Sequence, residues 1–373
     1  MEKNFHIKGR DCMILRESVQ KTVEKYDPRK LHIATIGSHS ALNIFKGAKE
    51  EGFTTVCICE HARKKVYDHF PIVDEYILLD DLSQILDDSI QQKLLSMNSI
   101  IIPHGSFNAY IGSEKIEESF QLPIFGNRAL LTWESHREMQ DKWLKLSGVP
   151  VPKTFRRPDE IDTLTITKFP RAKGGRGYFL ANNLESYERK AKEMLSKGHI
   201  SEEDLKEPQI QEYILGAPVY LHYFYSPLNN RLEFLGADRR YESNVDGLSR
   251  IPASDQIEAK IEATYTVIGN FMVLLRESLL SQVYELGEKV LEASRRIAPP
   301  GLIGPFCLET ICTESLKLIV FEVSCRIVAG CNVAIGYSPY TYLQFSEPMY
   351  MGRRIAREIR EGCKQNRIRE LVT

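Results

Sequence analysis

The sequence predicts a chain of mixed α/β and α+β class, in which a doubly wound parallel-sheet domain comes first. Two observations lead to this fold class. In the first third, continuous apolar runs alternate with helical patterns, as in a parallel sheet that is covered on both faces. In the remainder, antiparallel hairpins alternate with charged helices. With 373 residues, the chain is long enough for two or three domains.

The first third contains four apolar runs that predict strands. Between the first two, residues 38–52 show helical spacing of Leu42, Phe45 and Ala48, and Gly52 is a stop signal. The predicted strands are residues 31–37, 54–60, 75–81 and 98–106. We therefore expect a small doubly wound domain that ends near residue 125.

The middle of the chain changes pattern. A helix is predicted over residues 133–148, closed by Gly148 and by the two prolines that follow. Later elements are predicted from apolar runs, turn residues and helical spacing. They are strands at 163–170, 178–181 and 208–216, helices at 186–198 and 278–297, and a hairpin at 219–243 that turns at 227–230.

Composition argues against several function classes. The 49 basic and 50 acidic residues nearly cancel, so there is no electrostatic case for binding nucleic acid or an anionic membrane. The N-terminus has no signal-peptide core, and no apolar run approaches the roughly 20 residues of a membrane span. The expected compartment is the cytosol. The eight cysteines are scattered without a CxxC pair, which favours buried free thiols.

Two carboxylates near the C-terminus point to a cation. Residues 304–310 and 318–326 predict the strands of a hairpin, each with one central glutamate, Glu309 and Glu322. With a four-residue turn at 314–317, the two glutamates would lie directly opposite each other on one sheet face, where like charges repel. A hard cation would turn that cost into a binding site. The alternative is a solvated face whose charges pair with lysines.

A lysine and a glycine-rich loop point to phosphate. Lys168 interrupts an otherwise apolar strand, where a buried ammonium is costly unless it meets an anion. The loop Lys173-Gly174-Gly175-Arg176-Gly177 follows, and its backbone N–H groups can close over phosphates. It lacks the GxxxxGK[ST] pattern of a Walker loop, and an ordinary flexible turn is the alternative. Arg326, on the face of Glu322, also suits phosphate oxygens.

Two predicted strand tips carry serine and histidine together. Ser38-His39-Ser40 lies where a strand meets a helix N-terminus, a position suited to anions. Pro103-His104-Gly105-Ser106 repeats the pattern after another strand. Ligands of open parallel sheets bind beyond the carboxyl ends of strands, so the two tips predict one phosphorylated small molecule. An N-cap role for the serines is the alternative.

The order of these parts resembles the ATP-grasp superfamily. The chain is most similar to the archaeal formate-dependent 5-formaminoimidazole-4-carboxamide ribonucleotide (FAICAR) synthetases, and the similar segments span nearly its whole length. They are IATIGSHSALNIFKGAKEEGFTTVCI, IIPHGSFNAYIG, FGNR, KFPRAKGGRGYF, HYFYSPL, DRRYESNVDGL, RIPASDQ and MGRRIAREI. The resemblance implies a pre-ATP-grasp domain at residues 1–125, followed by an ATP-grasp pair at 126–215 and 216–373.

The resemblance implies an ATP-dependent carbon–nitrogen ligase of purine biosynthesis. Formate would be activated as formyl phosphate and transferred to 5-aminoimidazole-4-carboxamide ribonucleotide (AICAR), with Mg²⁺ or Mn²⁺ as the metal. The partners would be these small molecules, with neither nucleic acid nor membrane, and the subunits would form a homo-oligomer such as a hexamer. A divergent ATP-grasp ligase for another substrate and a nucleotide-binding paralogue with weak catalysis are the alternatives.

The resemblance also implies roles for single residues. Arg326 and Lys168 would be catalytic, and Glu309 and Glu322 would bind the metal. ATP would be held by Lys168, Lys173, Gly174, Gly175, Arg176, Gly177, Glu212, Tyr213, Ile214 and Glu242. The ribonucleotide would contact His39, Ser106 and Asn270. After the ExSxR motif, Ile327–Cys331 departs from the polar VDGGTN-like stretch that is usual there, which raises the question of whether it alters substrate or activity.

Overall fold

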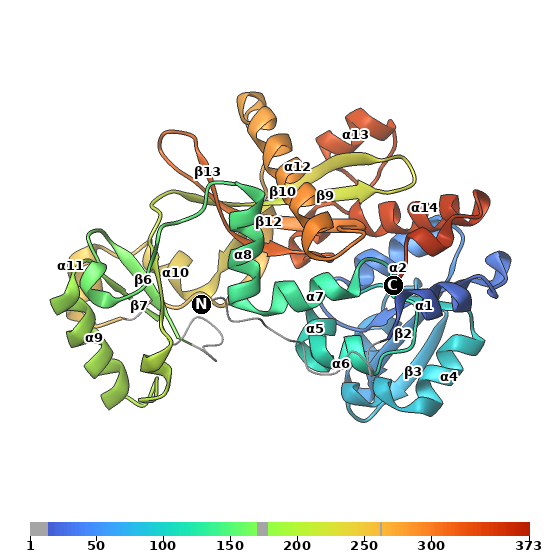
Figure 1. Ribbon diagram of the computed structural model, residues 1–373, viewed down its shortest axis with the longest axis horizontal. Coiled ribbons are helices and arrows are strands. Elements are labelled where there is room, and N and C mark those ends of the chain that lie inside the picture. Colours follow the sequence, from blue (N-terminus) through green and yellow to red (C-terminus); the bar gives the residue numbers. More distant parts are fainter. Residues whose placement is uncertain (1–13, 170–177, 262) are drawn as a thin grey trace.

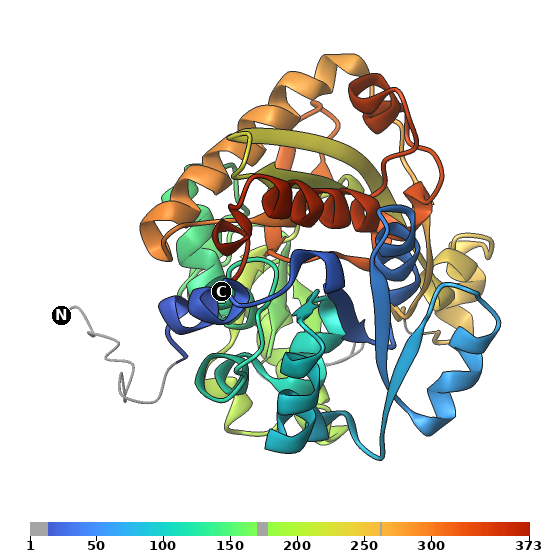
Figure 2. The same cartoon turned by 90° about the vertical axis from the view of Figure 1, so that its right-hand side faces the viewer.

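The structure, a computed structural model, describes residues 14–169, 178–261 and 263–373 (Figures 1 and 2). Its strands form three sheets that follow one another along the chain. The first sheet is parallel, and the other two are antiparallel. This is the mixture of α/β and α+β structure that the sequence predicts.

The first sheet has the strand order β3-β2-β1-β4. Its strands are β1 (His32–Ile36), β2 (Thr54–Glu60), β3 (Glu75–Leu79) and β4 (Ser99–Ile101), so the four predicted strands are confirmed. The helices of this part are α1 (Arg16–Val23), α2 (Ala41–Glu50), α3 (His61–Asp68), α4 (Asp88–Ser96), α5 (Gly105–Ile111) and α6 (Ser113–Glu118). The apolar strand residues are buried because helices pack against the sheet.

Residues near the C-terminus complete this first region. Ile124 pairs with Ile101 of β4, and its N–H donates to the carbonyl of Thr373 (3.0 Å). The buried guanidinium of Arg128 donates to the same carbonyl (2.8 Å). The C-terminal end of the chain therefore belongs to the same folded unit as the first sheet.

The second sheet has the order β5-β8-β6-β7. Its strands are β5 (Thr154–Phe155), β6 (Thr165–Lys168), β7 (Tyr178–Ala181) and β8 (Gln209–Glu212), and α9 (Leu184–Ser196) packs on it. A small core joins the sheet to the helix, with Phe155, Phe179 and Tyr187 among its buried members. The predicted strands and helix of this region are confirmed.

The third sheet has the order β11-β10-β9-β12-β13. Its strands are β9 (Ala217–Ser226), β10 (Arg231–Glu242), β11 (Val267–Met272), β12 (Gly304–Cys312) and β13 (Leu318–Ser324). The predicted turn at residues 227–230 joins β9 to β10, and two short helices, α10 (Ser243–Leu248) and α11 (Ala253–Glu258), lie between β10 and β11. The long helix α12 (Leu280–Ile297) packs on one face, where the Tyr223 hydroxyl donates to the carbonyl of Val283 (2.8 Å).

The opposite face of the third sheet meets α14 (Met351–Lys364), which follows α13 (Pro339–Phe345). Figures 1 and 2 place α14 beside α2 of the first region. Glycines allow this close crossing, because a Cβ at Gly47 would lie 2.1 Å from the backbone nitrogen of Arg353, and one at Gly352 would lie 2.1 Å from the carbonyl of Asn43. The crossing fixes the first region against the third sheet.

The helix predicted over residues 133–148 is divided in two. Helix α7 (Arg128–Ser135) ends before His136, and α8 (Arg137–Ser147) begins after it. His136 has φ −104° and ψ 114°, which is extended backbone. The single-helix prediction is therefore wrong at this point, although the predicted end at Gly148 is confirmed by its left-handed conformation (φ 66°).

Other predictions have mixed outcomes. The cysteines of the described part are free thiols, and Cys57, Cys59, Cys307, Cys325 and Cys331 are buried. Within the described ranges, no helix has the length and apolar character to cross a membrane. The domain boundaries at residues 125 and 215 stay predictions.

Candidate active site

The two glutamates of the C-terminal hairpin lie opposite each other, as predicted. Glu309 of β12 pairs with Glu322 of β13. The turn has five residues rather than four, because Cys312 pairs with Leu318. The predicted pairing holds nevertheless because of a bulge next to Glu309, where one residue of β13 has no counterpart on β12.

Glu309 is nearly buried and only half satisfied. Its Oε1 accepts from Arg240 of β10 at 2.5 Å, whereas its buried Oε2 has no hydrogen-bond partner among the described residues. Burial and the charge of Glu322 raise the pKa of Glu309 to about 8, although Arg240 acts in the opposite direction. The Arg240 guanidinium reaches Glu309 by lying over the ring of Tyr220 on the intervening strand β9 (4.4 Å).

Lys168 lies at the end of β6 and is in the electrostatic field of the same carboxylates. Its Nζ lies 3.4 Å from Oε1 of Gln211. Burial lowers the pKa of Lys168, and the negative charges of Glu322 and Glu309 partly oppose this shift. We name Lys168, Arg240, Glu309 and Glu322 the carboxylate half of the site.

A cavity of about 260 Å³ opens beside the carboxylate half. It lies between the second sheet, which contributes Lys168 and Gln211, and the hairpin, which contributes Glu322. Arg137 and Gln140 of α8 line it as well. The arrangement combines cationic and anionic groups around a space between two sheets, which suits a ligand that carries both phosphate and metal.

The two Ser-His strand tips meet, as predicted. The hydroxyl oxygens of Ser38 and Ser106 lie 2.9 Å apart, and the rings of His39 and His104 stack with centroids 5.4 Å apart. His104 is fully buried, and its Nε2 bonds to the carbonyl of Ile36 (2.9 Å). We name Ser38, His39, His104 and Ser106 the strand-tip half of the site.

The histidines of the strand-tip half are neutral at physiological pH. Burial lowers the pKa of His39 to about 3, with smaller contributions from His104 and Arg326. Burial also lowers the pKa of His104 to about 4. These imidazoles can therefore offer directed hydrogen bonds, but no positive charge.

Arg326 connects the two halves. Its charge lowers the pKa of both histidines, while Glu309 and Glu322 are among the groups that raise the pKa of Arg326 itself. Its position is fixed by Glu134 of α7, whose Oε1 accepts from the guanidinium at 2.9 and 3.0 Å. The second oxygen of Glu134 accepts from the backbone N–H of Cys325 (2.8 Å).

The segment that departs from the usual family pattern lies against the strand-tip half. Ile327 forms a parallel bridge to His104. The Asn332 amide donates to the carbonyl of His39 (3.3 Å), and the Asn43 amide donates to the carbonyl of Cys331 (3.1 Å). Residues 327–332 therefore form one wall of this half, and an effect on substrate choice stays a prediction.

Asn270 lies on β11 opposite Arg240, on the sheet face that carries the carboxylates. Its Nδ2 donates to Oδ2 of Asp238 (2.6 Å). Glu242 lies at the end of β10, and burial raises its pKa while Arg240 opposes the shift. Both residues are thus near the carboxylate half, and their nucleotide contacts stay predictions.

Residues 212–214, which are predicted to face adenine, use two of their backbone N–H groups in bonds within the protein. The N–H of Glu212 donates to the carbonyl of Lys153, and the N–H of Tyr213 donates to the carbonyl of Leu164, both at 2.8 Å. An adenine contact would have to use other groups of residues 212–214, such as carbonyl oxygens. The loop residues Lys173, Gly174, Gly175, Arg176 and Gly177 lie outside the described residues.

Comparisons with known proteins agree with this geometry. Two family models match, a domain of unknown function (DUF1297) at residues 186–373 and a protein of unknown function (DUF1246) at residues 33–155. A FAICAR synthetase of Archaeoglobus fulgidus is 52% identical over 358 residues, which are 96% of this chain and 99% of the relative. A second, of Methanopyrus kandleri, is 48% identical over 361 residues and matches over its whole length.

The chain belongs to the FAICAR synthetase family.

Solved structures agree with this membership. An IMP biosynthesis protein PurP from Thermococcus kodakaraensis superposes with a TM-score of 0.72 at 35% identity, over 91% of this chain and 100% of that one. A biotin carboxylase from Campylobacter jejuni superposes with a TM-score of 0.61 at 13% identity, over 88% of this chain and 70% of that one, which shows the fold alone. This FAICAR synthetase family member therefore has the predicted ATP-grasp fold.

The site contains two residues that the sequence reasoning missed. Arg240 of this family member lies in the charged end of β10, next to Asp238, Arg239 and Glu242, so its local sequence does not distinguish it from a solvated residue. Glu134 gave no signal either, because it lies among other charged residues of a helical segment.

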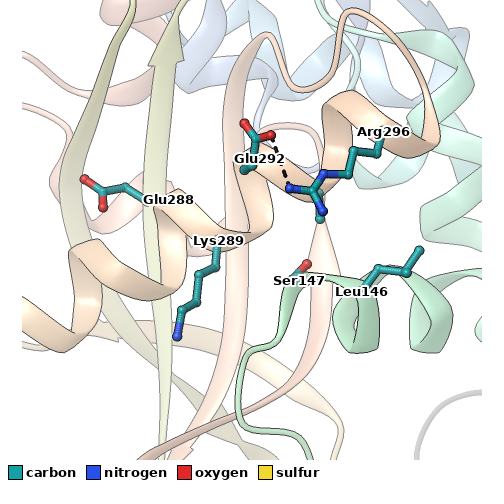
Figure 3. A pocket seen from close by; sticks show the side chains of 7 residues that line it. Leu146, Ser147, Glu288, Lys289, Glu292 and Arg296 are labelled. Carbon is teal, nitrogen blue, oxygen red and sulfur yellow. Dashed lines mark ion pairs between the residues drawn. The ribbon is translucent and has the colours of Figure 1, made fainter.

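A second pocket is separate from the predicted site residues. It has a volume of about 360 Å³ and lies between α8 and α12 (Figure 3). It is lined by Leu146, Ser147, Glu288, Lys289, Glu292, Ala293 and Arg296, and an ion pair of 3.5 Å joins Glu292 to Arg296. None of the residues predicted for the FAICAR synthetase reaction lines it.

Proposed function

We propose that this protein catalyses the ATP- and formate-dependent formylation of AICAR to FAICAR in purine biosynthesis. Family membership supports the reaction class, an ATP-dependent carbon–nitrogen ligase. The observation that carries the proposal is the position of Arg326, whose guanidinium lies with His39 against Gly105 and whose pKa is raised by Glu309. A reaction between a phosphorylated intermediate and a ribonucleotide needs such a link between two ligand sites.

The chemistry proceeds in two steps. A formate oxygen attacks the γ-phosphorus of ATP, and ADP leaves, which gives formyl phosphate. The exocyclic amine of AICAR then attacks the formyl carbon, phosphate leaves with the bonding electron pair, and the nitrogen loses a proton. Because the intermediate is sensitive to hydrolysis, catalysis depends on water exclusion, positioning and neutralisation of charge.

The hairpin carboxylates fit Mg²⁺. Glu309 has a buried oxygen without a partner, and it faces the like charge of Glu322. The described residues contain no cluster of three or more His, Cys, Asp or Glu side chains suited to a metal. Mg²⁺ is commonly held by one or two carboxylates together with phosphates and water, and neutralises phosphate charge when bound. We propose Glu309 and Glu322 as its ligands, and Mn²⁺ as a substitute with the same oxygen ligands.

We propose the remaining roles as follows. Arg326 neutralises charge on the transferring phosphoryl group. Lys168 and residues 173–177 hold the phosphates of ATP, while residues 212–214 and Glu242 contact its nucleoside. His39, Ser106 and Asn270 contact AICAR.

The test is ADP release from protein, Mg²⁺-ATP and AICAR, with and without formate. Release that requires formate supports the proposal, and FAICAR identified by mass spectrometry completes it. Release that requires a different acid supports a divergent ATP-grasp ligase. Nucleotide binding without any release supports a paralogue with weak catalysis, and either outcome would overturn the formylation.

We propose further that the protein forms a homo-oligomer, such as a hexamer, in the cytosol. The edge strand β11 and the residues after it support an association surface, because Ile268, Phe271 and Leu274 are 52–69% exposed. Light scattering coupled to gel filtration measures the mass. A monomer at micromolar concentration would contradict the oligomer.

A further inference from the structure

A line of buried polar side chains lies behind Asn270. His222 of β9 and Asp238 of β10 have side chains that are 3% and 2% exposed. Nε2 of His222 lies 2.7 Å from Oδ1 of Asp238, and Nδ2 of Asn270 lies 2.6 Å from Oδ2 of Asp238. Two donors thus converge on one carboxylate, and each oxygen takes one of them.

The chemistry of a carboxylate fixes which way the Asn270 amide points. An ionised carboxylate accepts hydrogen bonds and donates none. Asn270 must therefore turn its amino group toward Asp238 and its carbonyl oxygen away from it. That Oδ1 has no partner among the described residues, and Asn270 is half-buried, so a ligand can reach it.

Asp238 is itself held in place on several sides. A Cβ on Gly330 would lie 2.0 Å from its Oδ1, so the backbone of the 327–332 segment packs directly on the carboxylate. Burial opposes protonation of His222, but Cys331 and Asp238 outweigh burial and raise its pKa to about 10. A protonated imidazole donates from both nitrogens, so His222 can only donate to Asp238.

We propose that Asp238 and His222 are positioning residues that fix Asn270 as a hydrogen-bond acceptor for an N–H or O–H group of the ribonucleotide. This inference rests on the proposed function, in which Asn270 contacts AICAR. AICAR carries such donors on its amine, its carboxamide and its ribose. A nucleotide that presents an acceptor at the same point would meet an unpaired oxygen, and the site would discriminate against it.

Isosteric substitutions can invert the orientation of the Asn270 amide, so that it offers a donor to the ligand, and then restore an acceptor at the same position. In Asp238→Asn, as long as Nε2 of His222 remains a donor, the new amide turns its oxygen to His222 and its amino group to Asn270. Asn270 then flips and presents its amino group to the ligand. In the double variant D238N/N270D, the carboxylate introduced at position 270 accepts from the amide introduced at position 238. Its second oxygen points to the ligand, so an acceptor faces the ligand again.

The measurement is calorimetric titration of AICAR into the full-length protein with Mg²⁺ and a non-hydrolysable ATP analogue. We expect D238N to weaken AICAR binding by roughly tenfold or more and the double variant to recover to within about threefold of wild type. Affinity for the ATP analogue should stay within about twofold in both variants. Asp159→Asn is the matched control, because this carboxylate is 51% exposed and lies outside the site.

The outcomes distinguish a failure of the positioning role of Asp238 and His222 from a failure of the proposed formylation. Unchanged AICAR affinity in D238N, or a folded double variant that does not recover, would overturn the positioning role while the formylation stands. If D238N does not fold, a folded double variant with restored affinity still supports the inference. Wild-type protein that does not bind AICAR overturns both.

A second nucleotide locates the donor on AICAR. Inosine 5′-monophosphate has the amine and carboxamide of AICAR closed into a ring, but keeps the ribose hydroxyls. If D238N weakens binding of AICAR alone, the donor is an N–H that ring closure removes. An equal effect on both nucleotides places the donor on the ribose or on the carboxamide nitrogen, which keeps one N–H in the ring. If D238N affects only inosine monophosphate, the acceptor role for AICAR is wrong.

Discussion

The two halves of the site differ in how complete they are without a ligand. The strand-tip half is neutral and internally bonded, with its serines paired and both histidines uncharged. The carboxylate half places Glu309 opposite Glu322 and leaves a buried Glu309 oxygen without a partner among the described residues. In the first half the polar groups therefore bond to one another, whereas the second half leaves one carboxylate oxygen that a bound cation could take up.

Arg326 gives the largest expected effect, because it serves both halves. Arg326→Ala should lower kcat by about 10²–10³-fold, in the range seen when a group that stabilises developing charge is removed, and affect ATP affinity much less. Steady-state kinetics and titration with an ATP analogue measure the two quantities. Arg29→Ala, at an 88% exposed side chain, is the control. An equal loss in turnover and in ATP affinity would contradict the role.

Glu322 tests the carboxylate half alone. Glu322→Gln keeps the shape and removes one charge, so the Mg²⁺ concentration for half-maximal ADP release should rise by at least roughly tenfold. AICAR affinity should not change, since the strand-tip half is untouched. Glu314→Gln, in the exposed turn of the same hairpin, should behave as wild type. An unaltered Mg²⁺ requirement would remove Glu322 from the metal site.

Gly105 tests the strand-tip half alone. A Cβ there would lie 2.9 Å from Nε2 of His39 and 3.5 Å from the guanidinium carbon of Arg326. Gly105→Ala should therefore displace His39 and raise KM for AICAR by roughly tenfold, with KM for ATP unchanged. Gly247→Ala, where no heavy atom lies within 4 Å, is the control. A rise in KM for ATP alone would contradict the division into halves.

His222 gives the smallest expected effect, on stability. Its folded-state pKa of about 10 lies above the ordinary value of 6.5, because Cys331 and Asp238 outweigh burial. The resulting stabilisation is fully present below pH 6.5 and is lost as pH rises through 10. At about pH 7, wild type should therefore melt at a higher temperature than His222→Gln. This difference in melting temperature should shrink by a few degrees by about pH 10. A difference that is independent of pH would mean that His222 is not charged in the fold.

The carboxylate half was largely accessible from the sequence, since local pattern identifies strands and a charge within them. Glu309 and Glu322 were placed opposite each other by assuming a four-residue turn. The assumption was wrong by one residue, and the bulge beside Glu309 offset the error. Arg240 was missed because its bond to Glu309 passes over β9, and strand order is not encoded in any local pattern.

For the strand-tip half, the sequence predicted which strand ends meet but not the contacts that surround them. The pairing of Ser38 with Ser106 follows from the general rule that ligands bind beyond the carboxyl ends of parallel strands. The contacts of His39 and His104 with residues 326–332 do not follow from it, because they join parts of the chain that only tertiary packing brings together. The break at His136 likewise reflects packing, since residues 133–148 alone favour one helix.

The bond from Asn43 to the carbonyl of Cys331 spans 288 positions of the chain. Translation adds residues at roughly 5–20 per second, so the ribosome makes Asn43 roughly 15 to 60 s before Cys331. For most of that interval the strands of the first sheet have been synthesised, but the wall that residues 327–332 supply has not. The complete strand-tip half is therefore a late product of synthesis, and a chain interrupted before residue 326 would have the strand tips without the wall that packs against them.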